Sequence, residues 1–312
     1  MTRLSLSVLD LVPKLDGVSY EAALQEATVL AQSAEQWGYK RYWAAEHHDL
    51  ENLSCASPEV LLAHIGAKTE RIRLGTGALL LPHYSPLKVA ETFRLLAALY
   101  PGRIDLGIGR APGGSAHASM ALSGNFLQNV ADMPKKMRAL IKLLEDRYEY
   151  EDQRVQARPF PETEPDVWML GTNSKSAGFA AEYGTGYAFG QFMSERDGAE
   201  VLATYREGFQ PSRLSSRPRT MVAIGVICAE TEQEAKQLLR EAKLPGPERS
   251  GQEQKSAEAQ NRLLCGTPEQ VLSGLMQLAA HCGSAEFLVF TPIQDYKQRL
   301  DSYRLLAARC LA

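Results

Sequence analysis

Residues 72–108, IRLGTGALLLPHYSPLKVAETFRLLAALYPGRIDLGI, contain the pattern that decides the fold. Residues 72–81 form an apolar run that predicts a strand. Ser85 and Pro86 then begin a helix, with serine at the N-cap and proline at the first helical position. Residues 103–108 predict the next strand. A strand, a helix and a strand in this order indicate a βαβ unit, because parallel strands need a crossover connection between them.

The same alternation extends towards both ends of the chain. Further strands are predicted at residues 4–10, 41–46, 166–170, 186–190, 219–229 and 286–291. Further helices are predicted at residues 20–37, 125–146, 175–183, 196–209 and 296–308, after Ser57-Pro58, and after the capping box at residues 267–270.

Apolar strands that alternate with helices predict a parallel sheet covered on the outside by helices. Eight is the number of strands at which such a sheet closes into a barrel. We therefore predict an α/β fold, a (β/α)8 TIM-type barrel, with one domain over residues 1–312. A doubly wound open sheet is the alternative that the pattern leaves open.

Two segments interrupt the alternation. Residues 149–165 are polar and contain prolines, which predicts an extra connection or hairpin beside the barrel, after the fourth helix. Residues 244–261, LPGPERSGQEQKSAEAQN, are rich in Gly, Pro, Ser and charge. A loop of this length in a compact domain is usually functional or disordered. Because it follows the seventh strand, both a mobile lid over the active site and a disordered surface loop are open.

Composition excludes several classes of partner. The net charge is −3 and no basic stripe is present, so no nucleic-acid partner is expected. Five scattered cysteines without a CxxC pair predict free thiols in a reducing compartment and no cysteine metal site. The start MTRLSLSVLDLVP lacks a signal peptide's apolar region, and no run approaches the ~20 apolar residues that span a bilayer. We expect a cytoplasmic protein without a membrane partner.

Glu46-His47-His48-Asp49 ends the second strand, on the side where barrel enzymes place their catalytic groups. A histidine there suits acid–base work, because its ordinary pKa lies near neutrality. Adjacent residues of a strand point to opposite faces, so only one of the two histidines can face the barrel axis while the strand continues. A structural histidine is an equal alternative, and a metal site with Glu46, His47 and Asp49, near His83, is a further one.

Two glycine-rich strand ends indicate a ligand. Gly77 and Ala78 in the third strand would leave room for a flat ring, although glycines there could also make space for a bulky neighbour. The fourth strand ends in GIGRAPGG, residues 107–114, which misses the dinucleotide-binding spacing by one residue. Its Arg110 carries a guanidinium that suits the bidentate capture of a phosphate.

The turn Gly171-Thr172-Asn173-Ser174-Lys175-Ser176 ends the fifth strand and begins a helix. Free backbone N–H groups and the helix dipole make such a turn an anion site. Ordinary capping by Thr172, Asn173 or Ser174 is the alternative. This turn and Arg110 follow neighbouring strands of the predicted barrel, so together they predict a phosphate site.

In these residues the chain resembles the bacterial-luciferase-like, flavin-dependent monooxygenases, from the first strand to Thr291. The resemblance is strongest in WGYKRYWAAEHH (37–48), IRLGTGALLLPHYSPLKVAE (72–91) and PGRIDLGIGRAPGG (101–114). The segments LGTNSKSAGFAAEYG (170–184) and CGTPEQV (265–271) add to it. The order and spacing of these segments carry the resemblance more than any one of them.

The resemblance implies a barrel that binds FMN at the carboxyl ends of its strands. His47 matches the family's catalytic histidine, and the bond Gly77–Ala78 matches a cis peptide behind the flavin ring. The phosphate-binding positions correspond to Arg110, Gly171, Thr172, Asn173 and Ser176. Thr172 departs from the family, which has an acidic residue at this position.

The implied chemistry begins with reduced FMN, supplied by a separate flavin reductase or bound as a diffusing substrate. Its reaction with O2 gives a C4a-hydroperoxyflavin, which oxygenates a small organic substrate that the sequence does not identify. Family barrels commonly pair, which implies a homodimer. Three alternatives stay open: an F420-dependent hydride-transfer enzyme of the same superfamily, a flavin-binding protein without turnover, and a metal-dependent hydrolase that uses Glu46, His47 and His48. Light emission is not predicted.

Overall fold

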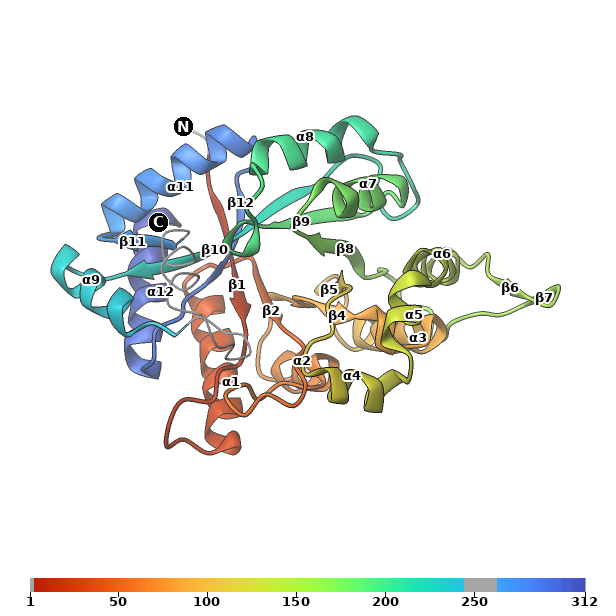
Figure 1. Ribbon diagram of the computed structural model, residues 1–312, viewed down its shortest axis with the longest axis horizontal. Helices are drawn as coiled ribbons and strands as arrows, with labels where there is room; N and C mark the ends of the chain where they lie inside the picture. The colour runs from red at the N-terminus through yellow and green to blue at the C-terminus, as the bar shows by residue number, and fades with distance from the viewer. Residues whose placement is uncertain (1–2, 244–262, 312) are drawn as a thin grey trace.

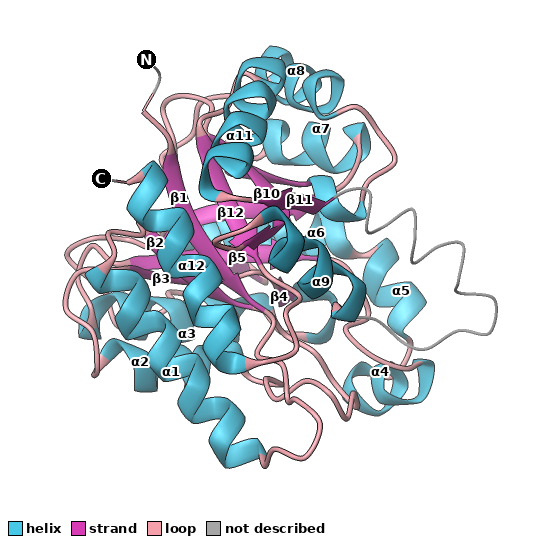
Figure 2. Cartoon of the chain, turned by 90° about the vertical axis from the view of Figure 1, so that its left-hand side faces the viewer, coloured by secondary structure: helices cyan, strands magenta, loops and turns pink. Residues whose placement is uncertain are grey.

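The computed structural model describes residues 3–243 and 263–311, and these residues form a closed parallel barrel surrounded by helices (Figures 1 and 2). The predicted (β/α)8 fold is therefore confirmed. Around the barrel the strands follow one another in this order: β1 (Ser5–Asp10), β2 (Arg41–Ala44), β3 (Arg73–Thr76), β5 (Ile104–Gly109), β8 (Asp166–Gly171), β9 (Gly186–Gly190), β10 (Thr220–Cys228) and β12 (Glu286–Phe290). β12 pairs with β1, and every pairing between these strands is parallel.

Helices cover the outside of the barrel, as Figure 2 shows. They are α1 (Tyr20–Gln36), α2 (Pro58–Gly66), α3 (Pro86–Leu99), α6 (Met133–Leu144), α7 (Ser174–Glu182), α8 (Gly198–Gly208), α9 (Glu232–Glu241), α11 (Pro268–Cys282) and α12 (Tyr296–Cys310). The capping box at the start of α11 is confirmed, because Thr267 accepts from Gln270 N and the Gln270 side chain accepts from Thr267 N. Ser57 and Ser85 occupy their N-caps without a side-chain capping bond, so proline sets these two starts.

Two predicted elements are divided in the structure. The predicted strand 72–81 separates into β3 and β4 (Leu79–Leu80), followed by a 3-10 turn, η1 (Leu81–His83). The predicted helix 125–146 is wrong as one piece, since α5 (Phe126–Ala131) ends before α6 begins. Pro134 lies in the first turn of α6, and a proline lacks the N–H that would continue the preceding helix.

Several short elements were not predicted from the sequence. They are α4 (Ala116–Ser123), α9 and β11 (Leu263–Gly266), which pairs with the second half of β10. Residues 149–165 contain the expected hairpin, formed by β6 (Glu149–Tyr150) and β7 (Gln153–Arg154), which projects from the barrel in Figure 1. The predicted loop 244–261 lies outside the described residues.

Charged side chains fill the barrel interior at the amino ends of its strands. Asp105 at the start of β5 is fully buried and accepts hydrogen bonds from Arg41 Nη1 at 2.6 Å, Trp43 Nε1 at 2.9 Å and Arg73 Nη2 at 2.6 Å. Burial raises the pKa of Asp105, but the charges of Arg41 and Arg73 outweigh it and hold the pKa below its usual value. The guanidinium of Arg41 also lies 5.1 Å from the ring centroid of Trp168. This network closes the barrel at the end opposite to the candidate site.

The five cysteines lie in the described ranges and are free thiols, as predicted. Of the helices in residues 3–243 and 263–311, none combines the length and the apolar character needed to cross a membrane.

Candidate active site

The candidate residues come from four strands that are neighbours in the barrel, β2, β3, β5 and β8. His47 follows β2, Gly77–Ala78 follows β3, Arg110 follows β5, and the turn 171–176 ends β8 and begins α7. Parallel strands bring all four segments to the same end, the carboxyl end, where barrel enzymes bind their ligands. The arrangement that the sequence predicted is therefore present in the fold, whereas the role of each residue stays a proposal.

Small residues form one wall of the barrel mouth at β3 and β5. The peptide bond Gly77–Ala78 is cis, as the resemblance implied, and both residues are only half-buried between the buried strands β3 and β4. A Cβ on Gly77 would lie 2.5 Å from Leu9 Cδ1, and a Cβ on Gly109 would lie 2.9 Å from Ala78 Cβ. Larger side chains would therefore displace their neighbours, and the wall stays flat.

His47 is half-buried, and its buried Nδ1 has no hydrogen-bond partner in the part of the chain that the structure describes. Burial lowers the pKa of His47 to about 4, and the neighbouring Glu46 charge opposes this decrease. The imidazole is therefore neutral at pH 7, with one ring nitrogen that accepts and one that donates. It lines a cavity of about 420 Å³ together with Tyr20, Leu50 and Ser54.

The lowered pKa of His47 predicts a change in stability with pH. Between pH 6.5 and 4 the unfolded chain binds more protons at this residue than the folded chain, so its contribution is complete above pH 6.5 and is lost as the pH falls towards 4. The loss is about 3 kcal/mol. His47→Gln does not titrate, so its free energy of unfolding should fall by about 3 kcal/mol less over this window.

Urea unfolding at pH 7.0, 5.5 and 4.5 measures this difference. The control is His64→Gln, which replaces an exposed histidine on α2 and should keep the wild-type pH dependence. An unchanged pH dependence in His47→Gln would contradict the lowered pKa.

His48 has a different environment from His47. Its Nε2 lies 2.8 Å from Glu46 Oε1, and its ring contacts that of His83 edge-on, with the centroids 5.8 Å apart. Asp49 accepts from Ser115, and the His83 ring nitrogens lie within hydrogen-bond distance of Ser123 Oγ and Pro112 O. In residues 3–243 and 263–311 no group of three His, Cys, Asp or Glu side chains could hold a metal ion.

Arg110 is exposed, and no other described residue bonds its guanidinium. Burial raises the pKa of Tyr187 to about 12, and the positive charge of Arg110 opposes this increase. Arg110 directly follows β5, which pairs with β8, the strand that leads into α7. The Tyr187 hydroxyl is 3.0 Å from Ser176 Oγ in the first turn of α7, so Arg110 and the start of α7 belong to the same sector of the mouth.

The turn before α7 contains a capping box, which was one of the two interpretations of this turn that the sequence allowed. Asn173 Oδ1 accepts from Ser176 N at 3.1 Å, and Ser176 Oγ accepts from Asn173 N at 3.4 Å. Among the described residues, the backbone N–H groups of Ser174 and Lys175 have no acceptor. The sequence did not single out these two N–H groups, which are free to bind an anion at the positive end of the helix dipole.

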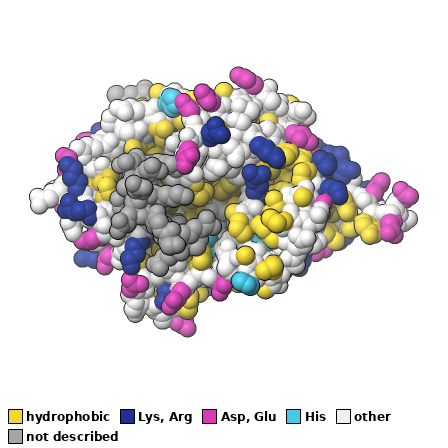
Figure 3. Space-filling view, viewed as in Figure 1, with side chains coloured by type: hydrophobic (Ala, Val, Ile, Leu, Met, Phe, Trp, Pro, Cys, Tyr) yellow, Lys and Arg dark blue, Asp and Glu magenta, His cyan; other side chains and the backbone are white. Residues whose placement is uncertain are grey.

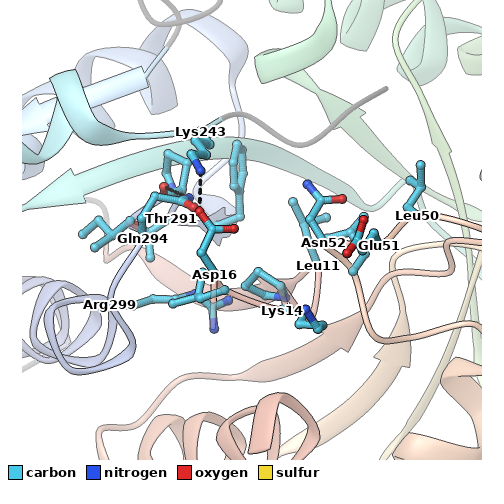
Figure 4. Close-up of a pocket in the computed structure, with 16 residues that line it drawn as sticks. Leu11, Lys14, Asp16, Leu50, Glu51, Asn52, Lys243, Thr291, Gln294 and Arg299 are labelled. Atoms are coloured by element: carbon cyan, nitrogen blue, oxygen red, sulfur yellow. Dashed lines mark hydrogen bonds and ion pairs between the residues drawn. The ribbon is translucent and has the colours of Figure 1, made fainter. Parts of the chain in front are cut away.

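A second cavity, of about 410 Å³, lies beside the mouth between the ends of β1 and β12 and the start of α12 (Figure 4). Asp16 and Lys243 form an ion pair of 2.8 Å at this cavity. Its wall includes Leu50 and Leu53, which also line the cavity of His47. The two cavities therefore flank the same loop, and both lie in a different sector of the mouth from Arg110 and α7.

A family model described as luciferase-like monooxygenase matches residues 6–286. The chain belongs to the luciferase-like monooxygenase family. Two relatives from Bacillus subtilis support this assignment. The chain is 41% identical to YwcH, and the match covers 97% of this chain and 98% of that protein. It is 33% identical to N-acetyl-S-alkylcysteine monooxygenase, and that match covers 98% of both proteins.

Solved structures of similar proteins agree with the fold of this luciferase-like chain. Apo-MsnO8 superposes with a TM-score of 0.87 at 33% identity, over 98% of both chains. The oxygenating constituent of 3,6-diketocamphane monooxygenase from Pseudomonas putida, in complex with FMN, gives a TM-score of 0.75 at 20% identity over 98% of both chains. An F420-dependent secondary alcohol dehydrogenase gives 0.75 at 16% identity over 99% of both. These last two similarities concern the fold alone.

Proposed function

We propose that this protein is a monooxygenase that uses reduced FMN and O2 to oxygenate a small organic substrate. The observation that carries the proposal is that Arg110 and the start of α7 follow the neighbouring strands β5 and β8. Within residues 3–243 and 263–311, the exposed guanidinium of Arg110 and the backbone N–H groups of Ser174 and Lys175 have no partner, so they offer a phosphate the donors that it needs. The flat wall at Gly77 and Ala78 fits a planar ring next to this phosphate site.

In this proposal each segment of the mouth has one task. The phosphate is held by Arg110, Thr172 and the backbone N–H groups at the start of α7. Gly171 leaves space for the Ser176 side chain, since a Cβ on Gly171 would lie 2.1 Å from Ser176 Oγ. Asn173 and Ser176 act through the capping box, which holds the turn in place. Bound FMN, once reduced, would supply the electrons with which O2 is activated.

His47 is the proposed catalytic residue. Because its imidazole is neutral at pH 7, it can donate a hydrogen bond or act as a weak base at the mouth. It does not carry the extra proton that a general acid would donate. We also propose that the organic substrate occupies the 410 Å³ cavity of Figure 4, whose volume lies in the usual range for small-molecule sites. N-acetyl-S-alkylcysteines, the substrates in the name of one relative, are the first candidates to test.

The remaining proposals concern assembly. We propose that the whole chain acts as one domain and that reduced FMN comes from a separate reductase. A homodimer would cover Val60 on α2 and Leu95 and Leu99 on α3, which are 66%, 51% and 56% exposed. α2 and α3 pack against each other, so one partner surface could cover both. Sedimentation velocity measures the oligomeric state.

The decisive experiment is a titration of the purified protein with oxidised FMN, photoreduced FMN and F420 under anaerobic conditions, followed by absorbance and fluorescence. We expect tighter binding of reduced FMN than of F420, because reduced FMN is the proposed working species. A preference for F420 would replace the proposal with hydride transfer by the same site. Binding of neither would contradict any flavin-dependent function.

A further inference from the structure

Glu46 lies two residues after β2 and directly before His47, and its carboxylate is buried, with only 2% of the residue exposed. Burying a carboxylate is costly unless hydrogen bonds compensate for the lost water. No lysine or arginine of the described chain pairs with it. The groups that compensate for its burial are therefore His48, Tyr84 and a backbone N–H.

Three donors from separate segments surround this carboxylate. Oε1 lies 2.8 Å from His48 Nε2 and accepts from the Tyr84 hydroxyl at 2.8 Å, while Oε2 accepts from the Leu80 N–H at 2.8 Å. Leu80 is in β4, two residues after Ala78, and Tyr84 directly follows η1. The hydrogen bonds of Glu46 thus connect the loop of His47 to residues 80–84, which follow the flat wall at Gly77 and Ala78.

His48 extends the connection to the loop of Arg110. Its backbone N–H donates to Gly113 O at 2.8 Å, three residues after Arg110. The contact is tight, because a Cβ on Gly114 would lie 2.1 Å from His48 O. Through His48, Glu46 is therefore linked to a third segment of the proposed flavin site.

We propose that Glu46 is a positioning residue, which holds the segments of His47, Ala78 and Arg110 in one arrangement at the mouth of the barrel. Folding alone gives little reason for a buried carboxylate, since apolar side chains of similar volume are usually as stable or more stable in such places. The inference rests on the proposed flavin site for its effect on binding. The connection itself can be measured without flavin.

The three hydrogen bonds can be tested with two variants, Glu46→Gln and Glu46→Ala. Leu80 N–H can only donate, so in Glu46→Gln the amide oxygen must take the place of Oε2. The amide nitrogen then faces His48 Nε2 and the Tyr84 hydroxyl, and both of these can accept. His48 would move its proton from Nε2 to Nδ1, and all three connections would remain. Glu46→Ala removes all three.

The experiment compares the FMN affinities of Glu46→Ala, Glu46→Gln and a control, Glu59→Gln. The control removes another partly buried carboxyl close to Glu46, which bonds none of the three segments. We expect Glu46→Ala to raise the Kd for FMN roughly 10- to 100-fold, as removal of supporting residues does at metal sites. Glu46→Gln and Glu59→Gln should stay within about threefold of wild type, since they keep the connections.

Two measurements on the flavin-free protein test the connection directly. Nitrogen NMR of histidine-labelled protein should show the Nε2–H tautomer of His48 in wild type and the Nδ1–H tautomer in Glu46→Gln. Hydrogen exchange at the Leu80 amide should be faster in Glu46→Ala and unchanged in Glu46→Gln. If wild type binds neither FMN nor F420, the proposed function fails, while these measurements still decide whether Glu46 holds the segments.

Two results would overturn the inference. One is a wild-type Kd for FMN in a folded Glu46→Ala protein. The other is an equal increase of this Kd in Glu46→Gln and Glu46→Ala, which would show that the charge of Glu46, and not its hydrogen bonds, is responsible. If Glu46→Ala does not fold, Tyr84→Phe removes one connection and keeps the carboxylate. It is expected to raise the Kd for FMN by a smaller factor, about three- to tenfold, and an unchanged Kd would count against the inference.

Discussion

Replacement of Arg110 by alanine is expected to raise the Kd of the protein for FMN by about 100-fold, equivalent to about 3 kcal/mol of binding free energy. The physical reason is the loss of a bidentate, charge-assisted contact with the phosphate, among the strongest hydrogen bonds that a side chain forms. No described residue bonds the Arg110 guanidinium, so the substitution leaves no carboxylate without its partner. The free energy of unfolding should therefore hardly change.

Riboflavin separates this contact from a general effect on the site. It has the same ring as FMN and no phosphate, so Arg110→Ala should bind riboflavin as wild type does. Arg71→Ala is the matched control, because it removes the same charge from an exposed side chain just before β3, at the opposite end of the barrel. An equal loss of affinity for riboflavin and FMN would show that Arg110 does not bind the phosphate.

The second large effect is expected at the other end of the barrel. Asp105→Ala should lower the free energy of unfolding by about 3 kcal/mol, because it removes the carboxylate that Arg41 and Arg73 share and leaves them only their pairs with Glu286 and Asp166. Arg41 is only 4% exposed and would lose its contact of 2.6 Å, and Trp43 Nε1 would lose its acceptor. For a chain of this size, such a loss lowers the Tm by roughly 10 °C.

Thermal unfolding followed by circular dichroism tests this expectation. Glu232→Gln removes one partner of the exposed pair Lys236–Glu232 and should change the Tm by little, because surface ion pairs contribute little to stability. Asp105→Ala should bind FMN with wild-type affinity at temperatures where it is folded. A Tm within about 2 °C of wild type would mean that the buried network is not important for stability.

The barrel could be predicted from the sequence because its signals are local. Apolar runs, N-caps and prolines recur in the right order, and each acts within a few residues. The division of the strand at Gly77–Ala78 was not predicted, although the resemblance implied a cis peptide there, because apolar residues continue on both sides of this bond. α9 was missed because it is mostly polar and buries only Ala235 and Leu238. β11 is too short to stand out beside the polar segment before it.

The positions of the candidate residues at the strand ends could be predicted, whereas their contacts could not. Residues at strand ends are brought together by the barrel itself, so His47, Arg110 and the turn before α7 could be named in advance. The hydrogen bonds of Glu46 could not, because two of its donors are 34 and 38 residues away in the sequence. Likewise, the sequence at Asn173 and Ser176 fits both helix capping and anion binding. The two interpretations can be separated only when the positions of Tyr187 and Arg110 are known.

The separation of the buried network from the mouth has a consequence for how this chain can diverge. Asp105 lies in β5 and Arg110 directly follows this strand, and the five residues between the two positions correspond to about 16 Å of extended chain. Substitutions at such distances usually add independently. New loops at the carboxyl ends can therefore arise, and new substrates can be acquired, without loss of the interactions that keep the barrel closed. One scaffold could in this way give rise to enzymes with many specificities.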